Sequence, residues 1–324
     1  MTIKNSLEYK ASIIFRNKHF NTIYPTLFRK IKNIDFQRNR IKTPDCDFLD
    51  IDWSKIRSKR LLVLFHGLEG SSNGQYIKGM CRVFNKNNWD VLAMNYRGCS
   101  GEINKTVKFY HGGATDDIDY LLNLIEKDYE QIALVGFSLG GNMLLKYLGD
   151  GKYKLNCKIT SAAAISVPCD LKSAMENLAN KRNFIYSRRF LKALKKKVML
   201  KKKFLPDEIS DEDLKCIKSL KDFDDKYTAP IHGFIDAYDY YNKCSCKQFL
   251  EDIKIPTLII NAMDDPFLTP ECFPFKEAIV NPNLILVTPK HGGHVGFSSL
   301  NDEDYWTEKK VLDFMIKNTN NGEI

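Results

Sequence analysis

The chain has 324 residues, of which 44% are hydrophobic, so it is long enough for one large α/β domain or two ordinary domains with a sizeable core. The sequence contains no run of about 18 apolar residues and no signal-peptide pattern, so we expect neither a transmembrane helix nor export. Its net charge is +9, and its nine scattered cysteines lack the spacing of a disulfide framework, which favours reduced thiols in a cytoplasmic protein.

Strands and helices are predicted to alternate along most of the chain. Apolar runs that are typical of buried strands lie at residues 61–65, 91–96, 132–136, 162–167, 257–261 and 284–288. Helical patterns lie at residues 74–87, 115–127, 141–148 and 305–317, and the second of these begins with Thr115 as a candidate N-cap. The first sixty residues are expected to add antiparallel strands, because residues 50–53 alternate between acidic and apolar side chains. Together these elements predict a mostly parallel sheet with helices on both faces.

The alternation stops between residues 171 and 250, a segment that is predicted to be helical. It carries 18 Lys and Arg against 11 Asp and Glu, and so holds most of the excess positive charge. One predicted sheet strand precedes it and another follows it. We therefore expect residues 1–170 and 251–324 to form one α/β core, with residues 171–250 inserted as a helical cap over the carboxyl ends of the strands, where open α/β sheets bind ligands.

A candidate nucleophile lies where a predicted strand meets a predicted helix. Residues 136–140 read Gly-Phe-Ser-Leu-Gly, which is the G-x-S-x-G pattern of a nucleophile elbow. The two glycines lack a Cβ atom, so the strand and the helix can pack tightly while the Oγ of Ser138 projects above the sheet. A serine cap in an ordinary glycine-rich turn is the alternative, and the strand–turn–helix context favours the nucleophile.

A serine hydroxyl needs a general base, and candidate partners follow in the order that such an elbow requires, first an acid and then a histidine. Asp264 and His294 each follow one of the last two predicted strands. Asp265 is the alternative acid and His291 the alternative base. We expect Asp264, because it lies three residues after its strand, and His294, because its apolar neighbours can hold an imidazole in place.

The loop after the strand at residues 61–65 is a candidate oxyanion hole. It reads His-Gly-Leu-Glu-Gly at residues 66–70, and such a loop can bend to aim the amide of Leu68 at a developing oxyanion. The amide of Leu139, next to the candidate nucleophile, would be the second donor. His66 would orient the loop. An ordinary glycine-containing loop after a strand is the alternative.

Together these motifs resemble those of the α/β-hydrolase superfamily. They resemble most closely its YheT-like group, which also contains plant embryogenesis-associated proteins and animal abhydrolase-domain lipid esterases. The matching stretches span nearly the whole chain, and besides those above they include residues 17–25, 43–53, 95–101, 110–118 and 229–234. The resemblance implies a serine hydrolase of carboxylic esters with the triad on Ser138, Asp264 and His294, and acyl lipids are among its candidate substrates. We expect no cofactor and no metal.

Two further stretches allow two interpretations each. Residues 96–101 follow a strand and could reach the active site, or they could form a packed turn with Arg97 in an ion pair. Tyr110 and His111 could line the pocket, although we favour a structural contact between them.

The predicted cap contains a strongly basic stretch. Residues 181–203 hold eleven Lys and Arg and no acid, and Phe190, Leu191, Leu194 and Val198 fall near helical spacing. A basic amphipathic helix can lie on an anionic membrane. We favour instead a lid helix whose apolar face covers the pocket, because the acidic run at residues 207–213 can neutralise the charge. Nucleic acid is not an expected partner, because the patch is not interleaved with aromatic residues.

The leading hypothesis is an esterase that forms an acyl-enzyme through a Ser-His-Asp triad, acting on a small-molecule or lipid ester. Two alternatives stay open. One is an acyltransferase that uses the same site with an alcohol or thiol acceptor. The other is a non-catalytic binding protein on a hydrolase scaffold, since a fold does not fix a function.

Overall fold

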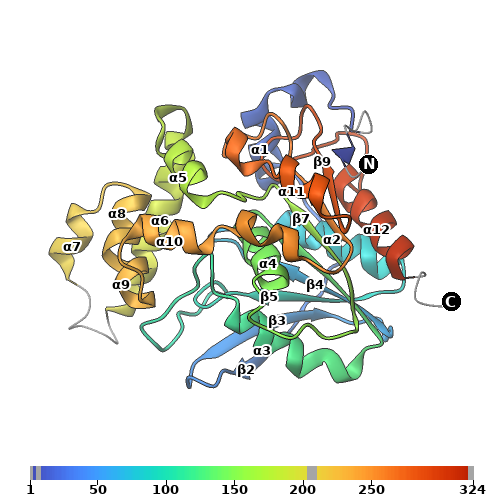
Figure 1. Cartoon of the computed structure of the whole chain (residues 1–324), viewed down its shortest axis with the longest axis horizontal. Coiled ribbons are helices and arrows are strands. Elements are labelled where there is room, and N and C mark those ends of the chain that lie inside the picture. The colour runs from blue at the N-terminus through green and yellow to red at the C-terminus, as the bar shows by residue number, and fades with distance from the viewer. Residues whose placement is uncertain (1–2, 5–8, 203–209, 320–324) are drawn as a thin grey trace.

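One nine-stranded sheet forms the centre of the protein in the computed structural model, which describes residues 3–4, 9–202 and 210–319 (Figure 1). Its strands are β1 (Ile3–Lys4), β2 (Gln37–Lys42), β3 (Phe48–Ser54), β4 (Arg60–Phe65), β5 (Asp90–Asn95), β6 (Gln131–Phe137), β7 (Ile159–Ile165), β8 (Thr257–Ile260) and β9 (Leu284–Val287). Their spatial order is β1-β9-β8-β7-β6-β4-β5-β3-β2. In this spatial order, each neighbouring pair from β1 across the sheet to β5 is parallel. The last two pairs, β5 with β3 and β3 with β2, are antiparallel. The predicted mostly parallel sheet and the antiparallel N-terminal strands are confirmed.

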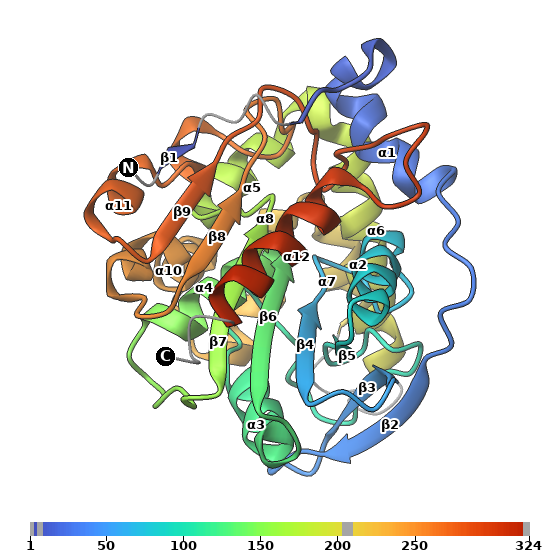
Figure 2. The same cartoon turned by 90° about the vertical axis from the view of Figure 1, so that its right-hand side faces the viewer.

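Helices cover both faces of the sheet. Those of the core are α1 (Lys18–Leu27), α2 (Gln75–Lys86), α3 (Asp116–Ile125), α4 (Leu139–Gly149), α11 (Phe275–Val280) and α12 (Trp306–Thr319). Figure 2 shows α2 and α12 on the face turned to the viewer, with α3 and α4 behind the sheet. Strand β4 shows why two layers are needed, because Leu61 and Val63 enter the core under α3 and α4 while Leu62 and Leu64 enter the core under α2 and α12. A parallel strand buried on both faces reads as a continuous apolar run.

The predicted N-cap of α3 lies at the expected position but does not cap the helix with its side chain. Thr115 is the residue before α3, as predicted, but its side chain makes no capping hydrogen bond. Its hydroxyl instead donates to the hydroxyl of Tyr153, at 3.3 Å. The first turn of α3 carries Asp116, Asp117 and Asp119, and these carboxylates suit the positive end of the helix dipole.

The described part of residues 171–250 contains helices and no strand. They are α5 (Leu171–Ala179), α6 (Phe184–Lys201), α7 (Asp211–Cys216), α8 (Leu220–Phe223), α9 (Ala229–His232) and α10 (Ala237–Cys244), which lie together on the left of Figure 1. Val198 of α6 packs in a separate cluster with Leu214, Ile217, Phe223 and Tyr227. After α10 the chain returns to the core, since the 3₁₀ segment η5 (Cys246–Asp252) packs on α4.

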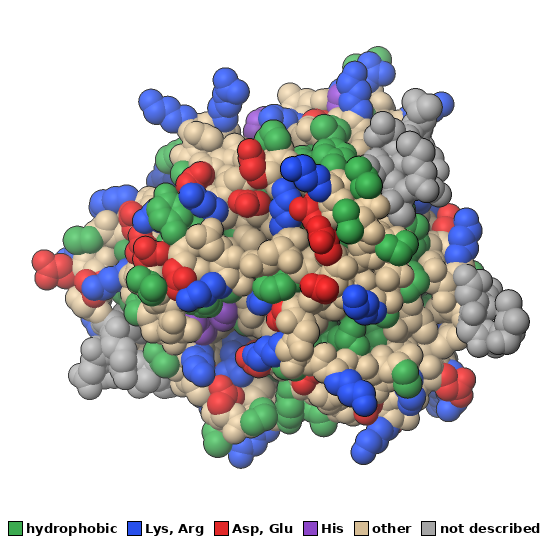
Figure 3. Space-filling view, in the orientation of Figure 1, with side chains coloured by type: hydrophobic (Ala, Val, Ile, Leu, Met, Phe, Trp, Pro, Cys, Tyr) green, Lys and Arg blue, Asp and Glu red, His purple; other side chains and the backbone are tan. Residues whose placement is uncertain are grey.

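The basic helix α6 turns part of its charge inward. Lys195 donates to the carbonyl oxygen of Ile217, Lys197 pairs with Glu69, and Lys201 donates to backbone carbonyls of the core. On the face drawn in Figure 3, cationic and acidic side chains are interspersed over cap and core alike. No helix within the described ranges is long and apolar enough to cross a membrane.

Candidate active site

Ser138 lies at a sharp turn between β6 and α4. Its φ is positive, with φ 51° and ψ −120°, a conformation that a non-glycine residue adopts only where its surroundings impose it. The flanking glycines are required by close packing. A Cβ on Gly136 would lie 2.6 Å from the carbonyl oxygen of Gly140, and a Cβ on Gly140 would collide with the carbonyl oxygen of His66. The sequence pattern therefore produces the elbow by the packing that was predicted.

The structure brings a histidine and a carboxylate to this serine. The Nε2 of His294 lies 2.9 Å from the Oγ of Ser138. The other ring nitrogen of His294, Nδ1, lies 2.8 Å from Oδ2 of Asp265 and 3.1 Å from Oδ1. Because a carboxylate only accepts hydrogen bonds, Nδ1 carries the proton and Nε2 is free to accept one from the serine.

The expectation that Asp264 contacts His294 is wrong by one residue. Asp264 instead accepts hydrogen bonds from the amide of Gly293, at 2.9 Å, and from Nδ1 of His291, at 3.1 Å. The chain makes a tight turn after β8, in which the amide of Asp265 donates to the carbonyl oxygen of Ala262. This turn directs the second carboxylate, and not the first, toward His294.

The two neighbouring carboxylates have different surroundings. The side chain of Asp265 is fully buried, and besides His294 it accepts the amide of Phe267 at 2.9 Å. Phe267 also packs on the imidazole of His294, with 4.1 Å between ring centroids. Burial raises the pKa of Asp264, although hydrogen bonds from Gly293 and His291 oppose that rise. Through its hydrogen bond from the amide of Gly293, Asp264 supports the loop that carries His294.

Most backbone amides of the loop at residues 66–70 donate hydrogen bonds to other groups of the protein. The amide of Gly67 donates to the hydroxyl of Tyr76, that of Glu69 to the hydroxyl of Tyr110, and that of Gly70 to the carbonyl oxygen of Gly67. Gly67 lies against the candidate nucleophile, since a Cβ there would be 3.1 Å from the Cβ of Ser138. The amide of Leu68, the predicted oxyanion donor, lies between these bonded amides.

His66 and Tyr110 support this loop from within the protein. His66 is fully buried, its Nδ1 lies 2.7 Å from the carbonyl oxygen of Gly67, and its Nε2 accepts the amide of Tyr96. Burial lowers the pKa of His66 to about 3, so the ring is neutral at physiological pH. Tyr110 stacks on Tyr96 and bonds Glu69, so its contacts are structural and are made to the loop.

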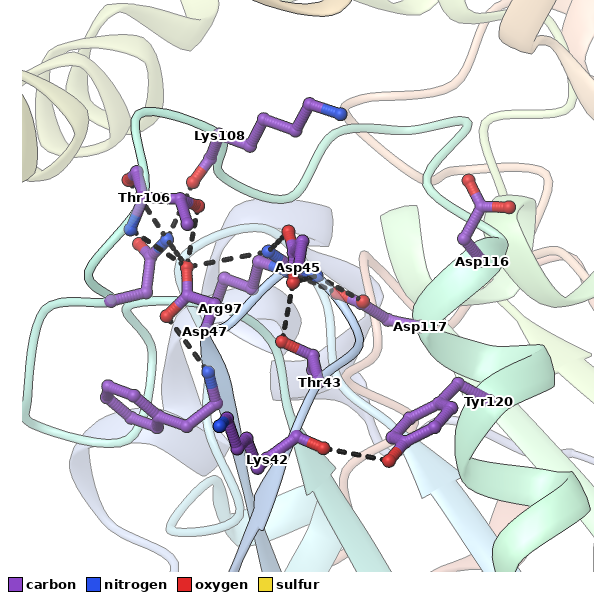
Figure 4. Close-up of polar contacts among 12 residues, drawn as sticks. Lys42, Thr43, Asp45, Asp47, Arg97, Thr106, Lys108, Asp116, Asp117 and Tyr120 are labelled. Atoms are coloured by element: carbon purple, nitrogen blue, oxygen red, sulfur yellow. Dashed lines mark hydrogen bonds and ion pairs between the residues drawn. The ribbon is translucent and has the colours of Figure 1, made fainter.

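Arg97 belongs to a packed turn at the edge of the core. Its guanidinium pairs with Asp45 at 2.6 Å and with Asp117 at 2.7 Å, as Figure 4 shows. The ion-pair interpretation of this stretch therefore agrees with the structure. Arg97 is absent from the cavity at Ser138.

A cavity of about 430 Å³ opens above Ser138 and His294. Its walls come from four sources: residues 67–76 at the loop and the start of α2, helix α1, helix α6 of the cap, and the loops that follow β8 and β9. The apolar lining includes Ile23, Leu27, Leu68, Phe190 and Phe267. Sequence reasoning missed the contribution of α1: residues 17–25 are among the stretches that resemble the family, but no local pattern in them indicates that they reach the site. Within the described residues, no group of three His, Cys, Asp or Glu side chains is placed to bind a metal ion.

Comparison with known proteins identifies the family of this fold. A family profile described as the alpha/beta hydrolase fold matches residues 60–299. The chain belongs to the α/β-hydrolase family. The matched region runs from β4 through the cap to the loop that follows His294, so it includes every candidate site residue.

Individual relatives place the chain near the YheT-like group, as the motifs implied. YheT of Escherichia coli strain K12, whose name marks it as a candidate esterase, is 36% identical over 321 residues, covering 96% of this chain and 94% of YheT. A mouse protein named phospholipase ABHD3 is 28% identical over 276 residues, which is 82% of this chain and 67% of that protein. The solved esterase Pf2001 of Pyrococcus furiosus shares the fold, with a TM-score of 0.57 and 18% identity over 88% of this chain and 93% of that one.

Proposed function

We propose that this α/β-hydrolase cleaves carboxylic esters through an acyl-enzyme on Ser138. The observation that carries the proposal is the hydrogen-bonded chain from Ser138 through His294 to Asp265, with contacts of 2.9 and 2.8 Å, at the floor of a cavity. A buried carboxylate that fixes the imidazole tautomer, and an imidazole that contacts a serine hydroxyl, form the arrangement that activates serine as a nucleophile.

The chemistry follows from this arrangement. Oγ of Ser138 attacks the ester carbonyl carbon as Nε2 of His294 takes the hydroxyl proton, and Asp265 stabilises the imidazolium. The amides of Leu68 and Leu139 donate to the oxyanion, because Leu139 is the first residue of α4 and a first-turn amide has no partner within its helix. Collapse breaks the bond to the alcohol, which leaves with the proton from His294. Water then attacks the acyl-enzyme by the reverse roles and releases the acid.

The lining supports esters with an apolar acyl group as substrates. Ile23, Leu27, Phe190 and Phe267 offer apolar walls beside the serine. The relative named phospholipase ABHD3 supports a lipid ester as one candidate. A panel of esters graded by acyl length, read by mass spectrometry of the products, would define the preference and would separate hydrolysis from transfer to an alcohol or thiol.

A fluorophosphonate probe tests the nucleophile directly. The wild type should be labelled on Ser138, and Ser138→Ala should lose labelling while keeping its melting temperature. Ester turnover should fall by roughly a thousandfold or more, because only binding and oxyanion effects remain. Folded wild type that takes up no probe and cleaves no ester would support a binding protein on a hydrolase scaffold.

A further inference from the structure

The oxyanion loop holds one residue in an unusual backbone conformation. Glu69, which follows Leu68, has φ 53°, in the left-handed region that favours glycine. Such a conformation persists only where neighbouring contacts enforce it. The carbonyl of Leu68 lies in the same peptide unit as the amide of Glu69, and the amide of Leu68 lies one peptide unit earlier. Contacts that hold Glu69 therefore restrict the backbone rotation of Leu68, and with it the direction of the Leu68 amide.

Two side chains hold the carboxylate and backbone of Glu69. The hydroxyl of Tyr110 accepts the amide of Glu69 at 2.7 Å and donates to its Oε1 at 2.8 Å. Lys197 reaches the same Oε1 with its Nζ, at 2.7 Å, and also lies 2.9 Å from Sγ of Cys99. Only 19% of the Lys197 side chain and 8% of the Glu69 side chain are exposed, so water screens this pair little.

Lys197 comes from a different part of the fold than the loop it holds. It lies on α6 of the cap, 128 residues from Glu69, and the same helix supplies Tyr186 and Phe190 to the walls of the catalytic cavity. Tyr186 also contacts α1, since its hydroxyl lies 3.1 Å from Nδ1 of His19. The helix that touches the substrate cavity is therefore ion-paired to the loop that carries the Leu68 amide.

We propose that Lys197 is a positioning residue for ester cleavage: by holding Glu69 it fixes the Leu68 amide, so the oxyanion hole is complete only while the Lys197–Glu69 pair is intact. The inference rests on the proposed function. It adds that the cap, besides shaping the cavity, controls transition-state stabilisation. Loss of the Lys197–Glu69 pair should lower kcat much more than it raises KM, because an oxyanion donor acts chiefly in the transition state.

The same helix offers a matched control one turn further on. Lys201 is buried, and its Nζ donates to the carbonyl oxygens of Thr106, Val107 and Lys108, at 2.6, 3.2 and 2.9 Å. Figure 4 shows Thr106 of this receiving loop held by Asp47. Lys201 thus fastens α6 to the core as Lys197 does, but it has no contact with residues 66–70 among its hydrogen bonds.

The experiment compares Lys197→Met with Lys201→Met in the full chain. It measures kcat and KM on a short p-nitrophenyl ester, the inactivation rate by a fluorophosphonate, and the melting temperature. For Lys197→Met we expect kcat and the inactivation rate to fall together by about ten- to a hundredfold, which is less than the loss of a whole oxyanion donor, with KM within about twofold. For Lys201→Met we expect both rates within about threefold of wild type despite a lower melting temperature.

Further variants keep the inference falsifiable. Glu69→Ala, which also removes the hydrogen bond from Tyr110 to Oε1, should lower kcat at least as much as Lys197→Met. The double variant should be no worse than Glu69→Ala, because that variant has already lost the pair with Lys197. If Lys197→Met does not fold, Glu69→Gln, which weakens the charge pair but keeps an acceptor for Tyr110, should still lower kcat.

Three results would overturn the inference. One is a wild-type kcat in Lys197→Met, or in the folded Glu69→Gln. Another is an equal loss of rate in Lys197→Met and Lys201→Met, which would mean that the cap is merely loosened. A wild type that neither cleaves esters nor reacts with the probe would remove the proposed function itself, and the inference with it.

Discussion

The core half and the cap half of the cavity are built in different ways. In the core half, Ser138, Asp265 and His294 lie on loops that follow β6, β8 and β9, and the chain is strained at the serine and at Val295, with φ 51° and 55°. In the cap half, α6 offers apolar side chains to the cavity and places Lys197 and Lys201 against core groups. The core half thus holds the groups that are proposed to react, while the cap half shapes the cavity and is held to the core by its lysines.

From this difference we predict which properties change when each half is mutated. Changes in the core half should abolish turnover with little effect on stability, because the loops are held by the sheet. Changes in the cap half should alter acyl preference, rate or the pH dependence of stability. The following predictions test that division from the largest expected effect to the smallest.

The sharpest test of the core half is Asp265→Asn. Asparagine keeps the size of the side chain but can donate to Nδ1 of His294 and so favour the wrong tautomer, and it removes the charge that stabilises the imidazolium. We expect kcat to fall by about a thousand- to ten-thousandfold, with a melting temperature near that of wild type. Steady-state kinetics on any ester that the wild type cleaves would measure it, and an active Asp265→Asn would break the assignment of the triad.

The cap half should instead govern which acyl groups are accepted. Phe190 lies on α6 and lines the cavity, so Phe190→Ala removes apolar contact that a long acyl chain would use. We expect kcat/KM for long-chain esters to fall by roughly ten- to a hundredfold, while that for acetate esters changes by less than about threefold. An equal loss on long and short esters would show that Phe190 does not select acyl length.

Asp264→Asn is the matched control for the adjacent carboxylate. Its amide oxygen can still accept the amide of Gly293, and only the charge beside His291 is lost. We expect a loss of about tenfold or less in kcat, from looser support of the loop that carries His294. Comparing kcat of Asp264→Asn with that of Asp265→Asn decides which of the two carboxylates serves His294. The assignment fails if Asp264→Asn is the less active variant.

The sequence predicted the sheet and the elbow well, because both depend on local patterns. Apolar runs identify strands that are buried on two faces, and the glycines around Ser138 are required within five residues of each other. The expectation of Asp264 over Asp265 is wrong, because the choice depends on a turn whose hydrogen bond runs from the amide of Asp265 to the carbonyl oxygen of Ala262. Long-range pairs such as Lys197 with Glu69 have no local pattern at all.

The cap also meets the core through a pair of histidines away from the active site. His232 of α9 and His111 of the core loop have ring centroids 4.3 Å apart and line a second cavity of about 510 Å³. Burial lowers the pKa of His232 to about 4, and the nearby charges of Lys108, Lys201 and Arg97 add to that effect. Burial and the neighbouring His232 likewise hold the pKa of His111 well below its usual range.

The smallest expected effect is therefore a pH dependence of stability that belongs to the cap. Between about pH 6.5 and pH 4 the unfolded chain binds protons that the folded pair does not, so the free energy of unfolding falls as the pH falls through this window. His232→Phe keeps an aromatic ring against His111 but cannot titrate. At pH 5 it should therefore retain about 1 to 2 kcal/mol of the stability that wild type loses relative to pH 8. Urea unfolding of both proteins at the two pH values would measure the difference. A wild-type pH dependence in His232→Phe would show that the acid sensitivity comes from other groups, such as the buried His66 of the core.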